Sequence, residues 1–349
     1  MKGVRGSKLR LLQCAAILGA TVCSNAAWAD WYNDGKVFLT GGVFTVDGAG
    51  GGGAVPWATI TGYETRDGIN GGVGFTYVKL PNYDLNFFGG SIGFFDRLEL
   101  SYVNVKLSTD LPTVDLVGLL LGNQTGLDAW NSQLHMNTYG AKLRLLGDAV
   151  YTSDSWIPQV AIGGLYKENT TPDFLETLHA YKDKDYEVYL AATKVFFRYS
   201  TLVNVTARYT SANQIGLTGF GYCNDALRRD CHNDKEVRFE ASVAHLLQKN
   251  FAIGFEYQQH GDNLDGRSLA IGALNLDPIV NLLDPVLGAV NLDSISEGLT
   301  QKEESDWYDF FFAYAPSKNY SITIAYLMLG NIAVAKDQNG LYLSLHATF

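Results

Sequence analysis

Short stretches of alternating apolar and polar residues recur along the whole chain. Residues 341–349 carry leucine, alanine or phenylalanine at every odd position and tyrosine, serine, histidine or threonine at every even one. Residues 236–243 and 320–326 alternate in the same way. A period of two predicts a β-strand with one apolar and one polar face.

Fourteen segments fit this description, and most are about ten residues long, which suits a tilted strand that crosses a bilayer. The predicted strands are 36–46, 57–64, 68–80, 84–95, 97–108, 134–147, 155–168, 185–198, 201–213, 235–247, 250–260, 305–315, 319–331 and 340–349.

The connections between these strands differ in length according to their order. Gaps after even-numbered strands are only a few residues, whereas long gaps follow odd-numbered strands at 109–133, 169–184, 214–234 and 261–304. A transmembrane barrel has short periplasmic turns and long outer loops, and a soluble sandwich has no reason to sort its loops this way. We therefore predict an all-β antiparallel transmembrane barrel of about 14 strands, within a range of 12–16.

The first 29 residues have the features of a secretory signal peptide. They carry four basic and no acidic residues, an apolar stretch over 11–22, and the small-residue cleavage site Ala27-Trp28-Ala29. We expect residues 1–29 to be removed on export and residues 30–349 to form the barrel in the outer membrane of a Gram-negative bacterium.

The export signal changes how the cysteines are interpreted. Only Cys223 and Cys231 remain in the mature chain, and an even pair in an exported protein predicts a disulfide. The alternatives are two free thiols, or a metal site that also includes His232 and Asp234. The spacing of the two cysteines matches no standard zinc motif.

Charge and composition exclude several functions. The signal peptide takes four of the 26 basic residues and none of the 36 acidic ones, which leaves the mature chain with a charge of −14. Such an acidic chain is unsuited to nucleic acid. Gly48, Gly50 and Gly53 match a dinucleotide-binding pattern, but a strand rather than a helix is predicted to follow them. We expect a flexible loop that folds against the lumen, and no cofactor.

Four stretches carry a family resemblance: residues 51–58, 97–102, 142–148 and 156–161. They resemble a family of exported bacterial proteins that is catalogued as a domain of unknown function and held to be outer-membrane barrels. The resemblance covers nearly all of the mature chain, and it implies a location but no reaction and no site residues. The strand number and apolar loops also give a weaker, fold-level similarity to long-chain fatty-acid channels.

Assigning the apolar strand faces to lipid turns a set of charged residues toward the lumen. Charges of both signs in a water-filled pore select solutes, whereas in a closed barrel they pair across neighbouring strands. The residues predicted to line the lumen are Arg97, Glu99, Lys142, Arg144, Lys167, Arg208, Arg238, Glu240, Glu256 and Asp309.

The last strand resembles the signal that barrel-assembly machinery reads, with Leu343, Leu345 and the terminal Phe349 on its apolar face. The expected partners are therefore this machinery, periplasmic chaperones, and the lipid and lipopolysaccharide of the outer membrane. Aromatic residues near strand ends predict interfacial girdles. They are Trp57, Trp156 and Trp307 near strand starts, with Tyr63, Tyr77, Tyr102, Tyr166, Tyr209, Tyr257, Tyr314 and Tyr326 toward strand ends.

Two predicted outer loops are unusually apolar, at 111–121 and 274–299. Exposed apolar area of this size needs a partner. These loops could fold inward as a plug or constriction, rest on the lipid surface, or bind a hydrophobic substrate. We expect an outer-membrane channel for small solutes, with hydrophobic solutes among the candidates and these loops as gate or binding surface.

Two other functions remain open at this point. One is a closed structural or adhesive barrel without transport. The other is a lipid-modifying enzyme built on His260 with Asp262, Asn263 and Ser268, although a hydrolase needs a serine, a histidine and an orienting group together. Asp262 and Asp265 are also candidates for calcium binding.

Overall fold

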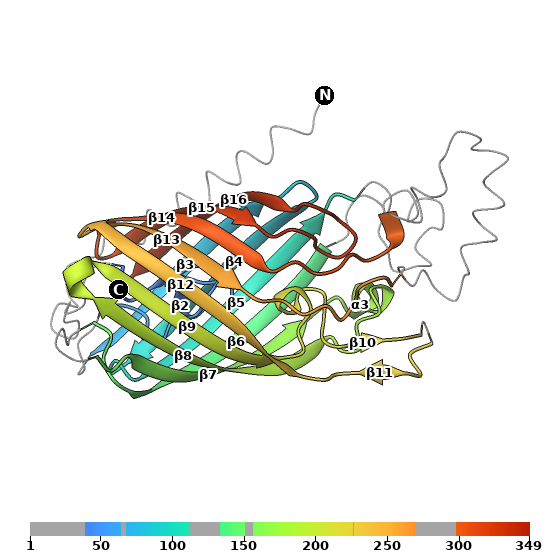
Figure 1. Cartoon of the computed structure of the whole chain (residues 1–349), viewed down its shortest axis with the longest axis horizontal. Helices are drawn as coiled ribbons and strands as arrows, with labels where there is room; N and C mark the ends of the chain where they lie inside the picture. Colours follow the sequence, from blue (N-terminus) through green and yellow to red (C-terminus); the bar gives the residue numbers. More distant parts are fainter. Residues whose placement is uncertain are drawn as a thin grey trace, which may run out of the picture.

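The protein is a closed antiparallel β-barrel of twelve strands (Figure 1). The computed structural model describes residues 39–63, 68–111, 133–150, 156–225, 227–267, 269 and 298–349. The predicted signal peptide lies outside the described residues. So do most of the apolar segments predicted at 111–121 and 274–299.

Each wall strand pairs with its neighbours in sequence, and β16 closes the barrel by pairing with β3 from Leu341↔Lys79 to Thr348↔Gly72. The wall consists of β3 (Ile69–Lys79), β4 (Tyr83–Phe94), β5 (Leu98–Thr109), β6 (Gln133–Leu146), β7 (Gln159–Asn169), β8 (Lys184–Phe196), β9 (Thr201–Thr210), β12 (Glu236–Gln248), β13 (Phe251–Gln258), β14 (Trp307–Ser317), β15 (Tyr320–Met328) and β16 (Asn339–Thr348).

The two ends of the barrel differ in the described connections. Tight turns join β4 to β5, β8 to β9, β12 to β13 and β14 to β15 at one end, which we call the short-turn end. The opposite, long-loop end carries α3 (Pro172–Thr177), the 3₁₀ turn η4 (Gln214–Gly216) and the small hairpin of β10 (Tyr222–Cys223) and β11 (Cys231–His232). A second 3₁₀ turn, η3 (Phe197–Tyr199), lies between β8 and β9. Cys223 and Cys231 face each other across β10 and β11 and form the disulfide.

The strand count differs from the prediction of fourteen because the first two predicted strands, 36–46 and 57–64, are not in the wall. Within the described residues, β1 (Val43–Phe44) and β2 (Gly50–Gly51) pair with each other and with no wall strand. Residues 43–53 are buried throughout, without the alternation of exposure that lipid on one side produces. These residues therefore lie inside the barrel.

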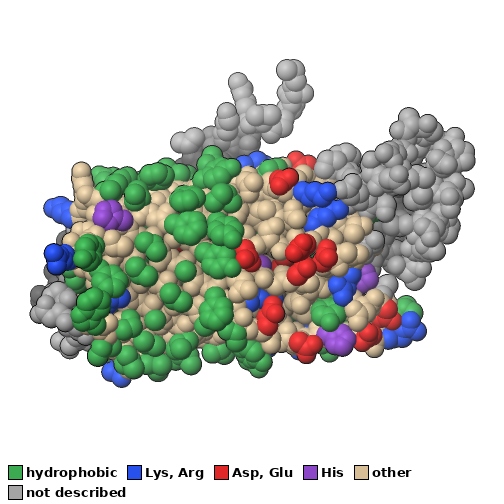
Figure 2. Space-filling model, viewed as in Figure 1, with side chains coloured by type: hydrophobic (Ala, Val, Ile, Leu, Met, Phe, Trp, Pro, Cys, Tyr) green, Lys and Arg blue, Asp and Glu red, His purple; other side chains and the backbone are tan. Residues whose placement is uncertain are grey.

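The outer surface of the wall is apolar. In β14, burial alternates along the strand, with Asp309 and Phe311 inside and Phe310 and Phe312 more than half exposed outside. Figure 2 shows hydrophobic side chains covering much of the wall, and acidic and basic side chains gathered toward the long-loop end. An apolar band of this kind is typical of a barrel that spans a membrane.

A row of tyrosines marks the edge of this band. Tyr102, Tyr139, Tyr166 and Tyr186 are directly opposite one another across β5 to β8, and all four side chains are exposed. Such a row is typical of the aromatic girdle at a membrane interface. The prediction for tryptophan was partly wrong, because Trp57 and Trp307 are buried inside the barrel whereas Trp156 is exposed.

No helix in the described part of the chain is long and apolar enough to cross a membrane.

The exposed position of Ile324 in the middle of β15 allows a test of the membrane-facing surface. Replacing it with arginine should destabilise the barrel by about 2–4 kcal/mol, because a charge near the bilayer midplane loses its hydration. Unfolding by urea in lipid vesicles measures this change. The matched control is Leu227→Arg, at an equally exposed site in the β10–β11 loop, which should change stability by less than about 0.5 kcal/mol.

Candidate functional site in the barrel lumen

The lumen is occupied by residues 39–63, which we call the inner hairpin. Val43 and Phe44 pair with Gly51 and Gly50, and the chain reverses direction between them. The backbone of Gly48 has a φ of +81°, a conformation that residues with a Cβ atom rarely adopt. The Gly-rich stretch therefore forms a tight turn inside the barrel, in agreement with the expectation that it folds against the lumen.

Both ends of the inner hairpin lie toward the short-turn end. The backbone amide of Leu39 donates to the hydroxyl of Tyr63, at 3.1 Å, so the two ends are adjacent. Near the second end, Thr61 contacts Ser91, which is close to the end of β4. The turn around Asp47 reaches Lys167 and Arg208, near the long-loop ends of β7 and β9. The hairpin thus enters from one end and extends through much of the barrel.

Lys142 and Glu99 hold the hairpin at Gly50, Trp57 and Thr61, and we call this pair the Lys142 anchor. The two residues are opposite each other on β5 and β6, and their charged atoms are 3.0 Å apart. Lys142 Nζ also donates to the carbonyl oxygens of Gly50 and Trp57. The Glu99 carboxylate accepts hydrogen bonds from the backbone amides of Gly50 and Thr61. A buried charge pair is stable only with such additional hydrogen bonds.

Asp47 is at the centre of the second attachment, the Asp47 cluster. Its two carboxylate oxygens lie 2.9 Å from Lys167 Nζ and 2.8 Å from Arg208 Nη2. The same two cations also pair with Glu187, and Arg208 pairs with Glu240. All five side chains are at most 5% exposed. The hairpin therefore supplies one carboxylate to two wall cations, which themselves bridge further wall carboxylates.

Glu256 on β13 binds the backbone of the hairpin turn. Its carboxylate accepts hydrogen bonds from the amides of Ala54, at 2.7 Å, and Val55, at 3.3 Å. The Ser242 hydroxyl donates to the same carboxylate. A Cβ atom at position 52 would collide with this carboxylate, so a larger residue there would have to displace the Glu256 side chain. Gly52 therefore allows the close approach on which this contact depends.

The structure buries eight of the ten side chains predicted to line the lumen and leaves two nearer the surface. Arg97 was wrongly assigned, because it lies in the turn between β4 and β5, where strand parity no longer applies, and it is exposed. Arg144 is partly buried and pairs with Asp96 at the short-turn end. The buried residues are Glu99, Lys142, Lys167, Arg208, Arg238, Glu240, Glu256 and Asp309.

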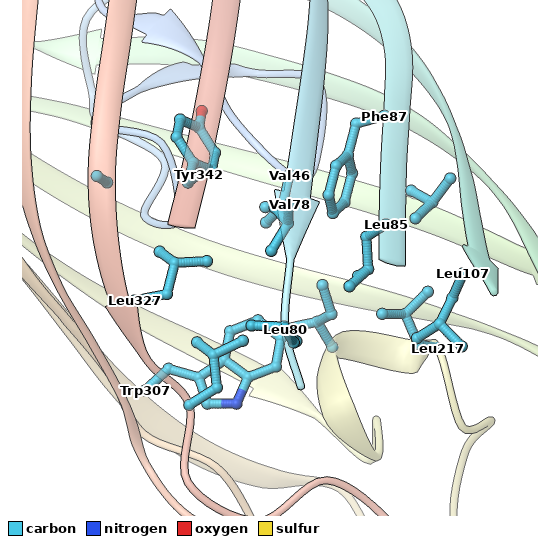
Figure 3. Close-up of a cluster of buried hydrophobic side chains, with 14 of the residues drawn as sticks. Val46, Val78, Leu80, Leu85, Phe87, Leu107, Leu217, Trp307, Leu327 and Tyr342 are labelled. Atoms are coloured by element: carbon cyan, nitrogen blue, oxygen red, sulfur yellow. The ribbon is translucent and has the colours of Figure 1, made fainter. Parts of the chain in front are cut away.

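Sequence reasoning missed Asp47, the inner hairpin and the apolar half of the lumen. The charged residues are concentrated on β7 to β13, whereas inward positions on β3 to β5 and β14 to β16 are largely apolar. Figure 3 shows these apolar side chains converging inside the barrel toward Val46 of the hairpin and Leu217 of the loop after η4. The Gly-Gly pairs at 41–42 and 50–53 give no usable signal, because wall strands β3, β4 and β7 contain such pairs as well.

Loop residues after β9 contact the inner side of the wall at the long-loop end. Lys167 Nζ donates to the carbonyl of Ile215, at 2.8 Å, and the Asn169 side chain donates to the carbonyl of Leu217, at 2.9 Å. Ile215 and Leu217 are both buried. Lys167 therefore contacts both the inner hairpin and this loop.

His260 does not have the geometry of a hydrolase base. Its ring is 2% exposed, stacks on Trp307 at 4.5 Å, and has no hydrogen-bond partner on either nitrogen. Burial lowers the pKa of His260 to about 3. Asp262 accepts a hydrogen bond from the Glu304 backbone and Asn263 donates to Asn213, so neither orients this ring.

The other parts of the enzyme and metal hypotheses have no further support in the described chain. Ser268 lies outside the described residues. Among the residues that the structure describes, no group of three or more histidine, cysteine or acidic side chains is placed to hold a metal ion. This applies to Asp262 and Asp265, and to the alternative that placed Cys223 and Cys231 in a metal site.

The Lys142 anchor predicts how firmly the hairpin is held. Replacing Lys142 with methionine leaves the buried Glu99 carboxylate without its cation, so we expect the folded state to lose about 3–5 kcal/mol. Protease cleavage within residues 39–63, together with urea unfolding, measures the loss. Lys79→Met, which breaks the exposed pair with Asp84, should cost less than about 1 kcal/mol. Equal effects of the two changes would contradict the anchor.

Glu304, at the long-loop end, predicts a pH dependence. Burial raises the pKa of Glu304 to about 8 from its usual 4.5, although Arg238 nearby opposes the shift and Glu236 adds to it. The contribution of Glu304 to the stability of the folded state is therefore fully present below pH 4.5. It is lost as the pH rises to about 8. Between pH 6.5 and about 8, where His260 stays neutral, the loss is about 2 kcal/mol.

Hydrogen exchange of residues 299–305, corrected for the intrinsic rate, should show this local loosening. Glu304→Gln should abolish the pH dependence, because an amide does not ionise. Glu303→Gln, at the exposed neighbouring position, should leave it unchanged. Persistence of the dependence in Glu304→Gln would assign it to another group.

The chain has low similarity to several solved structures. Among solved structures, the chain is similar to the KdgM porin, with 8% identity, 80% of this chain and 99% of that chain covered, and a TM-score of 0.41. It is similar to the NanC porin, with 9% identity, 80% and 98% covered, and a TM-score of 0.43. It is also similar to outer membrane phospholipase A from Escherichia coli, with 8% identity, 80% and 91% covered, and a TM-score of 0.35.

No curated protein matches the sequence. A family profile described as "Protein of unknown function (DUF3034)" matches residues 40–346, which include the inner hairpin and nearly all of the barrel wall. The resemblance seen in the sequence is thereby confirmed, and the chain belongs to the DUF3034 family.

Proposed function

We propose that this protein is an outer-membrane channel for small solutes and that the inner hairpin is its removable plug. In this proposal the short-turn end faces the periplasm and the long-loop end faces outward. The structure represents the closed state. Solutes pass when the hairpin withdraws toward the periplasm and the loop around Ile215 and Leu217 moves aside.

The observation that carries this proposal is the independence of the hairpin from the wall. The twelve wall strands form a complete ladder without β1 and β2. The hairpin is joined covalently to the wall through the chain between Tyr63 and Ile69, and both of its ends lie at the same end of the barrel. Its withdrawal therefore breaks ion pairs and side-chain contacts but no hydrogen bond of the barrel ladder.

The polar contacts that hold the hairpin suit reversible release. They include the Lys142 anchor, the Asp47 cluster and the carboxylate of Glu256. Apolar packing in the core, by Phe44, Val46 and Trp57 among others, holds the hairpin as well. When the hairpin withdraws, water enters the lumen and hydrates the separated charges. Separating these ion pairs therefore costs less free energy than it would in an interior without water. The freed wall would then present a charged half and an apolar half to a passing solute.

A second candidate is a closed structural barrel without transport. The hairpin inside the lumen and the contacts of Lys167 with Asp47 and Ile215 favour it. This candidate predicts a hairpin that never leaves. The same experiment separates the two functions.

The location and assembly of the barrel belong to the same proposal. Leu343, Leu345 and Phe349 are exposed on the lipid-facing side of the last strand, where assembly machinery could bind them during insertion. Periplasmic chaperones, lipopolysaccharide and the identity of the solute remain predictions.

Locking the hairpin to the wall tests the channel. A Cβ atom at Gly48 would lie 3.3 Å from Cβ of Val103 on β5, close to the spacing of about 3.5–4.5 Å in disulfides. In a planar bilayer, we expect the oxidised Gly48→Cys/Val103→Cys protein to remain silent. After reduction it should show the openings of the natural sequence.

The Gly48→Cys single variant controls for the strain at position 48, and Val103→Cys controls for the change on β5. The natural sequence with the same reductant controls for the Cys223–Cys231 disulfide. Openings of equal frequency in the locked protein would contradict the plug. Silence of the natural sequence under all conditions would favour the closed barrel.

A further inference from the structure

A cavity lies beside the inner hairpin, against the apolar half of the lumen. It has a volume of about 40 Å³, which is room for about three water molecules. Val78, Leu85 and Phe87 line one side, and Leu327 and Tyr342 line another. Figure 3 shows these side chains around a common space near Val46. Apolar walls alone would leave such a cavity dry.

One corner of this cavity is acidic. Glu256 and Asp309 are directly opposite each other on β13 and β14, and both line the cavity together with Gln258. Neither carboxyl group forms an ion pair with a basic residue in the described chain. In contrast, Glu99, Glu187 and Glu240, also buried in the lumen, each pair with lysine or arginine.

The two acidic groups also differ in their hydrogen bonds. Glu256 accepts from two hairpin amides and from Ser242. Asp309 is 5% exposed, and its Oδ1 atom has no hydrogen-bond partner. Gln258 Oε1 likewise has none. Two buried acceptors without donors therefore border an apolar cavity. They lie next to two carboxyl groups that hydrogen-bond to each other but have no cation. An unsatisfied buried acceptor is costly, and an unpaired buried charge more so.

We propose that this cavity is the binding site for a small cationic amphiphile, with a primary ammonium group at Asp309 and a short apolar body along Phe87, Leu327 and Tyr342. The ammonium would donate to Asp309 Oδ1 and Gln258 Oε1 and neutralise one charge of the acidic pair. The apolar body replaces water next to hydrocarbon. A carboxylate solute would instead be repelled by Glu256 and Asp309.

This inference rests on the proposed channel for access, because the inner hairpin encloses the cavity. Val46, Gly52, Gly53 and Ala54 form its inner side. The cavity is large enough for the ammonium head group of the solute. The apolar body of a longer solute would occupy the space that becomes free when the hairpin withdraws. The solute would then favour the open state, because it binds there with more contacts.

Calorimetric titration of the folded mature protein in detergent tests the site with three probes of equal chain length. Butylammonium chloride should bind. 1-Butanol should bind at least about tenfold more weakly, because it lacks the charge, and sodium butyrate should not bind. Equal affinity for all three probes would overturn the proposal. So would the absence of butylammonium binding, which would mean that Glu256 and Asp309 satisfy each other by sharing a proton.

Three variants locate the binding. Asp309→Asn should weaken butylammonium at least about tenfold while changing 1-butanol little. Glu168→Gln, which removes an exposed carboxylate near Lys184, should change neither probe. Ala325→Leu fills the cavity and should abolish both. If Ala325→Leu does not show the heat-modifiable gel migration of a folded barrel, the binding of butylammonium and 1-butanol to Asp309→Asn alone tests the site. Calcium or sodium chloride that competes equally with butylammonium would also overturn the proposal.

Binding and conductance are separate measurements, so the two proposals can fail separately. Butylammonium binding that Asp309→Asn removes, in a protein that never conducts, would support the site and the movement of the hairpin that admits the probe, but would reject conduction of solutes. Conductance without butylammonium binding would support the channel and reject the site.

Discussion

The width of a twelve-stranded barrel governs the rest of this structure. Eight strands enclose a space that side chains of the wall just fill, and sixteen or more leave an aqueous channel. Twelve strands lie between these limits, so the wall alone leaves a space that either water or another part of the chain must occupy. Here the chain itself occupies it, through residues 39–63. The buried charges, the glycines and the apolar cavity are all consequences of how that segment is accommodated.

The filling segment is held by a different kind of bond from those that hold the wall. Wall strands share continuous backbone ladders, whereas the hairpin is attached by side-chain contacts. These include Asp47, the Lys142 anchor and Glu256, and the apolar packing of residues such as Phe44, Val46 and Trp57. Buried ion pairs contribute little net stability relative to apolar packing, although breaking one partner of a pair is costly. Buried ion pairs of this kind fix the position of the hairpin. They add little to the free energy needed for its withdrawal, provided that water enters the lumen as it leaves. This combination is expected of a plug.

The lumen is also divided by chemistry. One half of the wall carries the cations that bind Asp47 and the carboxylates that surround them, and the other half is apolar. Glu256 and Asp309 lie where the two halves meet, next to the cavity. A passing solute would contact both halves at once, which favours molecules with one charged and one apolar part. A wide porin for sugars or simple ions has no need of the apolar half.

The sequence predicted most of the wall because membrane-spanning strands have a strict period of two and loops sorted by length. It also identified the inward charges, apart from Arg97, whose position in a turn removes it from the alternation. It could not place residues 36–46 and 57–64, because a segment buried inside a barrel is as apolar as a strand that faces lipid. The role of Asp47 depends on Lys167 and Arg208, more than 100 residues away, and no local pattern reveals such a contact. The cavity arises in the same way, from side chains on six wall strands.

The most direct test of the account is the conductance of a barrel from which residues 30–63 have been removed, compared with that of the full mature chain. Because the wall ladder is complete without the hairpin, the shortened protein should still show the heat-modifiable gel migration of a folded barrel. In a planar bilayer, it should give steady openings larger and longer than those of the full chain. A folded, shortened barrel that stays as closed as the full chain would contradict the claim that the inner hairpin is the plug.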